Sequence, residues 1–381
     1  MSLTICYVIV ALILALVAKN NKATNLFLAI TLYLLLAFEH SEQDYINYVR
    51  AYDAVGAGSV FELLGYEPSF FLFCTLGNHY GLTFDAARAI ICVFEVLAIF
   101  STIKVFSSQI ACILALFLIF PATADAELFR WLGGMSLVVF AFPYIIRGES
   151  NRDYIMYSAL VLLATTIHTS CVFFLVYNIM YFQDKKKVLL IVLAAFCILF
   201  ATAQTFLLYK ILAYLPIQDS LNDKFQMTGQ SNIFGLMSIT LRELFVFLLG
   251  YLSYHKYKRS NFSLAFVDGR PSFKRRKYSQ HQMSVLLCDK LWYINIISIL
   301  LIAVAVYTPQ VQRLFHVLLF LNTIAAIYLA TNTRKNALKI TTIICVILTL
   351  ILHLFNGPQN MEIFMSHFNE GFLVNFIDVC F

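Results

Sequence analysis

The sequence predicts an all-α, polytopic membrane protein, and three observations lead to this fold class. Of the 381 residues, 61% are hydrophobic and only 13% are charged, and the mean hydropathy is +0.79. The apolar residues form continuous runs instead of the strict alternation of membrane β-strands. Because a helix needs about 20 apolar residues to cross a hydrocarbon core of about 30 Å, we expect about twelve transmembrane helices in one integral membrane domain, residues 1–381.

Twelve apolar runs supply these helices. They lie at about residues 3–17, 24–38, 88–105, 109–121, 131–146, 153–167, 169–183, 188–208, 233–253, 291–307, 312–330 and 340–356. The first run has no basic residue before it, and Lys19 and Lys22 follow it directly. A cleavable signal peptide has the opposite order of charge, so we expect a retained helix.

The positions of lysine and arginine predict the orientation. The loops that this threading places inside hold most of the cations, and the largest of them, residues 255–290, contains the run KRRK at 274–277. The positive-inside rule then puts both termini outside. The outer segments are residues 39–68, residues 209–232 and the tail, residues 357–381. We attribute the net charge of +6 to topology and lipid headgroup contact, not to nucleic-acid binding.

The first outer segment contains a polar island, FEHSEQDYINYVRAYDAVG, between apolar runs. Asp44, Tyr48 and Tyr52 recur every four residues, and Tyr45 falls on the same side, so a helix would place them on one face. This face fits two interpretations. The tyrosines could form an interfacial aromatic belt, or the rings and the Asp44 carboxylate could bind a sugar.

A short apolar segment follows near residues 69–80. Pro68 suits the first position of a helix and favours an extended backbone at Glu67. The segment is too short to cross a bilayer, so we expect a short or re-entrant helix that is buried in protein or lines a watery cavity. Glu67 then either caps this helix or, partly desolvated and with a raised pKa, acts as a general base.

Four further polar residues interrupt the apolar pattern. Arg130 and Arg313 each stand at the mouth of an outer turn, where each either snorkels to lipid headgroups or binds a phosphate. His168, in TTIHTS, is expected at a helix reversal near the outer surface, either as a satisfied buried histidine or in a wet pocket. Arg242 lies inside an apolar run, so it must pair, and it could reach a phosphate.

No cofactor or metal site is predicted. The nine cysteines show no CxxC or Cys/His spacing, which argues against a disulfide framework or a zinc site. No glycine-rich nucleotide loop is present, so ATP-driven transport is unsupported.

Five short motifs occur along the chain in the order DYINY (44–48), YEPSF (66–70), FRW (129–131), IHTS (167–170) and QRLF (312–315). In this order they resemble the EpsG-type family of Wzy-like polysaccharide repeat-unit polymerases, over most of the chain. The sequence departs from the family's pattern at two points. Residues 41–43 contain no glycine where the family usually has one before the aspartate, and Trp131 stands where a glutamine usually follows the arginine.

The resemblance implies a glycosyltransferase with its active site on the outer face of a bacterial plasma (inner) membrane. Such an enzyme moves a growing glycan from polyprenyl (undecaprenyl) diphosphate onto the non-reducing sugar of a lipid-linked repeat unit, in capsule, exopolysaccharide or O-antigen synthesis. The implied partners are the lipid-linked donor and acceptor, membrane lipids, and flippase and chain-length regulator proteins.

The resemblance also implies a site, which consists of Asp44, Tyr45, Tyr48, Glu67, Arg130, His168 and Arg313. Glu67 is the first candidate for the base that takes the proton of the acceptor hydroxyl, and His168 is the second. Arg130 and Arg313 would stabilise the charge of the diphosphate without a metal, with Arg242 as a further phosphate contact. The acidic and aromatic residues of DYINY would orient the acceptor sugar.

Two alternative functions stay open. A transporter or flippase of lipid-linked oligosaccharide would also need outer arginines and an aromatic groove, although it would ordinarily show repeated halves and polar residues on both faces. An O-antigen ligase would share the lipid-linked substrate, and the motif order argues against it.

Overall fold

The described part of the chain is helical and contains no strand, which confirms the all-α prediction. The computed structural model describes residues 10–11, 13–14, 17, 20–40, 43–58, 66–126, 128–204, 233–260, 278–305, 313–333 and 336–354. Most of the first apolar run, the outer segment 209–232, the KRRK run and the tail lie outside these residues.

Each apolar run from the second to the twelfth coincides with a helix in the described residues. The elements are α2 (Lys22–Ala37), α3 (Gln43–Gly56), α4 (Pro68–His79), α5 (Phe84–Phe106), α6 (Ile110–Phe117), η2 (Leu118–Ala122), α7 (Thr123–Asp125), α8 (Phe129–Arg147), α9 (Asn151–Ile167), η3 (Thr169–Phe182), α10 (Lys185–Gln204), α13 (Ile233–Arg259), α14 (Gln280–Ala305), α15 (Leu314–Asn332) and α16 (Asn336–Leu354). The expected short helix near 69–80 is α4.

Five of the described helices are long and apolar enough to cross a membrane, namely α5, α8, α14 over residues 280–301, α15 and α16. The apolar helices α2, α6 with its continuation to Asp125, and η3 are shorter. The chain is therefore a membrane protein with several candidate spans, and the total of about twelve crossings stays a prediction.

The exposed faces of the spans fit a lipid surrounding. On α5, Ile90, Phe94 and Leu97 lie on one side of the helix and are 49%, 64% and 56% exposed. By contrast, every residue of α15 from Leu314 to Ala330 is buried. The bundle thus has a central helix, α15, which contacts α13, α14 and α16.

The ends of the helices follow from local sequence. The Asn21 side chain accepts the N–H of Thr24 at the start of α2, and Thr83 does the same for Ala86 at the start of α5. Pro68 occupies the first turn of α4, where its missing N–H costs no hydrogen bond. Gly148 ends α8 with φ of 50°, a conformation that glycine adopts without strain.

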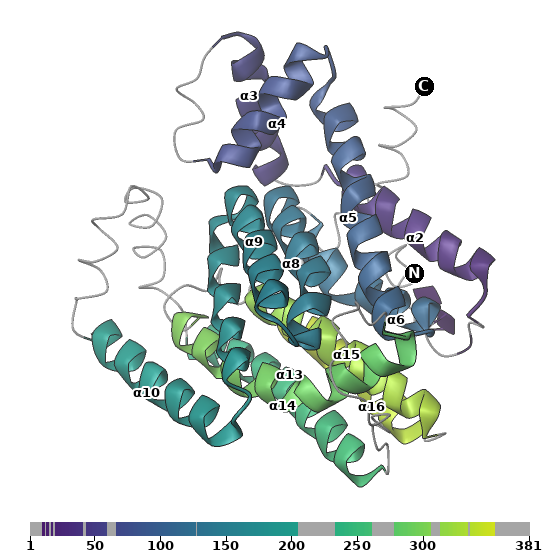
Figure 1. Cartoon of the computed structure of the whole chain (residues 1–381). Helices are drawn as coiled ribbons and strands as arrows, with labels where there is room; N and C mark the ends of the chain where they lie inside the picture. Colours follow the sequence, from purple (N-terminus) through teal and green to yellow (C-terminus); the bar gives the residue numbers. More distant parts are fainter. Residues whose placement is uncertain are drawn as a thin grey trace.

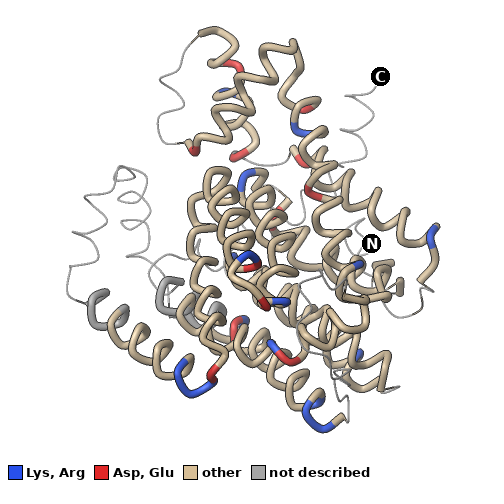
Figure 2. The backbone as a smooth tube through the Cα atoms, in the orientation of Figure 1, with Lys and Arg blue, Asp and Glu red and all other residues tan. Residues whose placement is uncertain are grey.

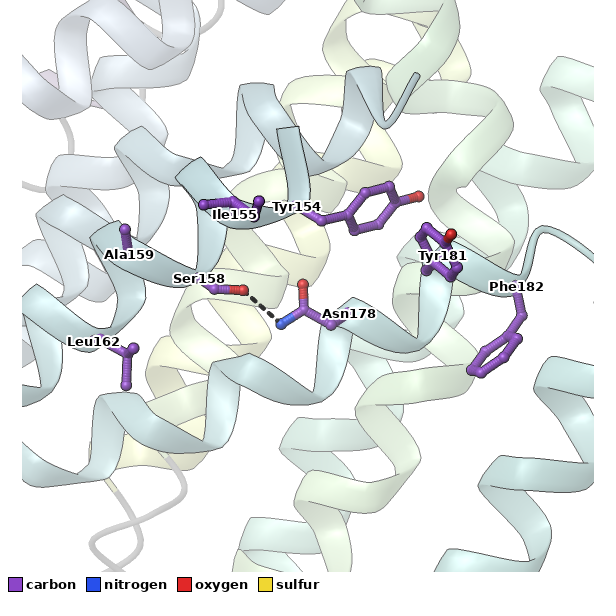
Figure 3. A pocket seen from close by; sticks show the side chains of 8 residues that line it. All are labelled: Tyr154, Ile155, Ser158, Ala159, Leu162, Asn178, Tyr181 and Phe182. Carbon is purple, nitrogen blue, oxygen red and sulfur yellow. Dashed lines mark hydrogen bonds between the residues drawn. The ribbon is translucent and has the colours of Figure 1, made fainter. Parts of the chain in front are cut away.

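The predicted reversal at His168 is confirmed. His168 has extended dihedrals between α9 and η3, and the two elements pack against each other. Tyr157 donates to the carbonyl of Phe174, and the Asn178 amide donates to Ser158 across 3.0 Å. Figure 3 shows this second bond in an open groove between the two helices.

The pair of α3 and α4 lies at one end of the bundle, beyond α8 and α9 in Figure 1. The two helices pack on each other, and α4 also contacts α9. In Figure 2 some of the Lys and Arg segments lie at the lower edge of the view, opposite this pair, and others lie at mid-height. The orientation of the chain across the membrane stays a prediction from the cation pattern.

Candidate active site

The carboxylate of Glu67 joins three segments that are distant in sequence. Glu67 is the N-cap residue of α4, with φ of −71° and ψ of 152°, and its side chain does not cap that helix. Instead it forms an ion pair with Arg130 in the first turn of α8. Its Oε1 accepts the backbone N–H of Thr169 at 3.1 Å and the Thr169 hydroxyl at 3.2 Å. The helix-cap interpretation of Glu67 is therefore wrong.

The surroundings of Glu67 hold it in its charged form. Its side chain is 12% exposed, and that of Arg130 is 19% exposed. Burial alone would raise the pKa of Glu67, but the Arg130 guanidinium, the His168 ring and the N–H of Thr169 together bring this pKa below its usual value. The sequence interpretation expected a raised pKa, so the direction is opposite to that expected for a general base.

Aromatic rings surround the Arg130 guanidinium. Its carbon lies 4.7 Å from the ring centre of Tyr66, 5.3 Å from that of Tyr48 and 5.7 Å from that of Phe70. Its Nε also donates to the Tyr48 hydroxyl at 3.4 Å. Cations over aromatic faces gain electrostatic energy, and more so where water is excluded. The rings and Glu67 together fix the position of Arg130. Its positive charge is therefore already paired with groups of the protein.

The tyrosines of α3 have different partners although they were predicted on one face. Tyr48 is buried and reaches Arg130. Burial raises the pKa of Tyr48, and the nearby Arg130 charge opposes part of that effect. Tyr45 donates to Asp85 at 3.0 Å and stacks on His40, and Tyr52 donates to the carbonyl of Leu82. Only Tyr48 of these three contacts the Glu67–Arg130 pair directly.

Asp44 is the remaining residue of the predicted face. It lies in the first turn of α3. Its negative charge acts on Tyr48 and raises the pKa of that phenol. Within the described part of the chain, Asp44 forms no hydrogen bond or ion pair, so its carboxylate is available to a ligand.

His168 lies beside the Glu67–Arg130 pair. Its Nδ1 is 2.6 Å from the Ser170 hydroxyl, and its ring meets the Trp131 ring edge to face at 5.5 Å. The charge of His168 acts on Glu67. The structure therefore brings together Tyr48, Glu67, Arg130 and His168, all four of which were singled out from the sequence.

Arg313 and Arg242 belong to a neighbouring region. Arg313 is the N-cap residue of α15, and its charge lowers the pKa of Tyr48, although burial keeps that pKa raised overall. Among the described residues, Arg313 has no hydrogen-bond or ion-pair partner. Arg242, in α13, is 4% exposed and donates to Nδ1 of His353 at 3.0 Å. These two arginines lie close enough to interact electrostatically.

Sequence reasoning missed three residues of this neighbouring region. Asp125 and His316 are hydrogen-bonded across 2.8 Å, and the ring centres of His316 and His353 are 6.5 Å apart. The available signal was a histidine near the outer end of each of two late apolar runs. Neither histidine belongs to a recognisable motif, so only the fold reveals that they meet.

Among the described residues, no group of three or more His, Cys, Asp or Glu side chains is arranged to hold a metal ion. The charged groups of the two regions are mainly arginine, histidine and single carboxylates. Such groups suit recognition of a phosphate and of sugar hydroxyls.

A comparison with protein families identifies the chain. The sequence model of the EpsG family matches residues 22–364. The chain belongs to the EpsG family. The match covers nearly the whole chain, including both regions of the site, and it confirms the resemblance inferred from the motifs. The EpsG family is a Wzy-like, polymerase-associated family. No curated protein and no solved structure matched the chain.

Proposed function

We propose that this EpsG-family protein is a polysaccharide repeat-unit polymerase. It transfers a glycan from polyprenyl diphosphate onto the non-reducing sugar of a lipid-linked repeat unit at the outer face of a bacterial plasma membrane. The observation that carries the proposal is the meeting of Glu67, Arg130 and His168 from three separate segments. The family membership supports the same reaction class.

The acceptor sugar would lie against Tyr66, the partly exposed ring beside Arg130. Sugar rings stack on aromatic faces, and Tyr66 is itself held by stacking on the buried Phe70 at 4.8 Å. The Asp44 carboxylate would accept hydroxyl protons. Tyr45 would act indirectly, because its hydroxyl is bonded to Asp85.

The diphosphate would bind at Arg313, with Arg242 close by. Departure of polyprenyl diphosphate develops negative charge, and fixed cations stabilise such charge without reorganisation. Arg313 has an uncommitted guanidinium among the described residues, and Arg242 lies near it. Arg130 would contribute its charge while keeping its ion pair with Glu67. Metal independence is part of this proposal.

The experiment that tests the function uses the purified full chain with a synthetic polyprenyl-diphosphate repeat unit and excess chelator. We expect a ladder of longer lipid-linked glycans. Movement of the substrate between leaflets of a vesicle without any elongation would instead indicate a flippase. Transfer only to an added outer-core acceptor would indicate a ligase.

A further inference from the structure

The neighbouring region, which contains Arg313 and Arg242, centres on a buried carboxylate–imidazole pair. Asp125, at the end of α7, and His316, in the first turn of α15, are 0% and 3% exposed in their side chains. Asp125 Oδ2 accepts a hydrogen bond from His316 Nδ1 over 2.8 Å. This bond places the ring hydrogen of a neutral His316 on Nδ1. The lone pair is therefore on Nε2.

His316 Nε2 has no hydrogen-bond partner among the described residues, and neither has Asp125 Oδ1. Buried polar atoms are normally hydrogen-bonded, so an unpaired ring nitrogen calls for an explanation. An imidazole that is oriented by a carboxylate and keeps its second nitrogen free is the arrangement by which proteins hold a proton acceptor.

The charged and titratable groups that act on His316 come from several elements. Arg313 precedes it on α15, Arg242 comes from α13, and His353 comes from α16. The ring of Phe120 covers one side at 4.8 Å. A bound diphosphate would offset the charges of Arg313 and Arg242 beside the His316 ring.

The Asp125–His316 pair lies near the Glu67–Arg130 pair. Asp125 precedes Arg130 by five residues, which span at most about 17 Å of extended chain. The Arg313 charge acts both on His316 and on Tyr48, which contacts Arg130. Arg313 is therefore within electrostatic range of both regions.

We propose that His316, oriented by Asp125, is the proton acceptor of glycosyl transfer. The inference rests on the proposed function. The acceptor oxygen forms a bond to the anomeric carbon of the donor, the bond from that carbon to the diphosphate breaks, and the hydroxyl proton moves to His316 Nε2. The polyprenyl diphosphate leaves with the bonding electron pair, beside Arg313 and Arg242. Asp125 is a positioning residue that stabilises the imidazolium.

The two base candidates from the sequence are less suited to this role. The Glu67 carboxylate is bound to Arg130 and Thr169, and its pKa is lowered, which makes it a weaker base. His168 has its Nδ1 beside the Ser170 hydroxyl instead of a carboxylate. His316 Nε2 is buried in the substrate-free structure, so the acceptor must uncover it on binding. Catalytic hydrogen bonds often form only in the substrate complex.

The experiment measures elongation at saturating donor as a function of pH. It compares the wild-type chain with His316→Gln, Asp125→Asn and the control His281→Gln. His281 is a histidine at the other end of the bundle that bonds to Tyr328. We expect His316→Gln to lower turnover by about 10²-fold to 10⁴-fold, with donor binding retained and the acidic limb of the pH profile lost. Asp125→Asn should lower turnover while leaving the donor KM unchanged, because the amide no longer fixes the tautomer.

Three outcomes would overturn the assignment. The first is a folded His316→Gln variant with wild-type turnover and pH profile. The second is loss of donor binding in that variant, which would make His316 a binding residue. The third is a loss of turnover in His281→Gln as large as that in His316→Gln. A wild-type chain that never elongates a glycan would overturn the proposed function itself, and with it this assignment.

Discussion

At the scale of single residues, Glu67 is the point from which the site is built. Its neighbour Pro68 starts a helix, and its carboxylate reaches a guanidinium and a backbone N–H in segments 63 and 102 residues further along the chain. The sequence identified the residue because Pro68 starts an apolar helix directly after it. It did not identify the partners, because a carboxylate at a helix start pairs locally or remotely according to tertiary structure.

The Glu67–Arg130 pair should show energetic coupling. Both side chains are mostly buried, and removing either one leaves the other charge without its partner. In a double-mutant cycle of Glu67→Gln and Arg130→Gln, we expect a coupling free energy of about 1–3 kcal/mol in detergent unfolding. Changes in unfolding free energy that simply add in the double variant would show that the two side chains are not coupled. Arg130→Lys should recover little of the stability lost in Arg130→Gln, because lysine lacks the planar guanidinium that stacks on the rings.

The Glu67–Arg130 pair should also make the stability of the protein depend on pH. The folded pKa of Glu67 is below its unfolded value, so the stabilisation is complete above about pH 4.3 and is lost as the pH falls through the folded pKa. The difference in Tm between the wild type and Glu67→Gln should therefore be largest near neutral pH and shrink on acidification. An equal Tm difference at pH 7 and in strong acid would exclude this linkage.

At the scale of elements, hydropathy predicted nearly every described helix. Apolar runs mark helices because the bilayer forces backbone groups to pair internally. The polar cluster TTIHTS also marked the α9–η3 reversal correctly. Which helices contact each other could not be predicted, since a uniformly apolar helix shows no preferred face. The meeting of Asp125 and His316, 191 residues apart, depends on that packing.

The packing of α8 against η3 depends on Gly134. A Cβ at this position would lie 2.6 Å from the Cys171 sulfur and 3.3 Å from the His168 Cβ. Gly134→Ala should therefore destabilise the protein by about 1–3 kcal/mol despite the better helix propensity of alanine, and should displace His168. Cys171→Ala removes the closest atom, so the double variant should regain part of the loss. Strictly additive changes in unfolding free energy would exclude this clash.

At the scale of the whole molecule, the predicted orientation gives both candidate regions the same side of the membrane. The Glu67–Arg130 pair lies by α3 and α4, and Asp125, His316 and His353 lie at helix ends that the prediction places outside. The cation pattern gives this orientation because inside loops retain lysine and arginine. Hydropathy alone could not show that one central helix, α15, carries part of the site.

A labelling experiment tests the orientation. Asp53→Cys places a thiol on an exposed position of α3, and Lys187→Cys places one in the first turn of α10. On intact cells, a thiol reagent that does not cross membranes should label the first variant and leave the second at the wild-type background. The reversed pattern would place the candidate site inside and exclude an outer-face polymerase.

The burial of α15 also constrains how the protein is made. Asn322, at its centre, exchanges hydrogen bonds with Asn295 of α14 and donates to the carbonyl of Val246 in α13. An amide of this kind is costly in lipid. We therefore expect α15 to enter the bilayer at low free-energy cost only when α13 and α14 have already inserted and can bond Asn322. Helix α16 would then insert and pack against α15. We therefore expect the candidate site to be complete only after α15 and α16 have both inserted.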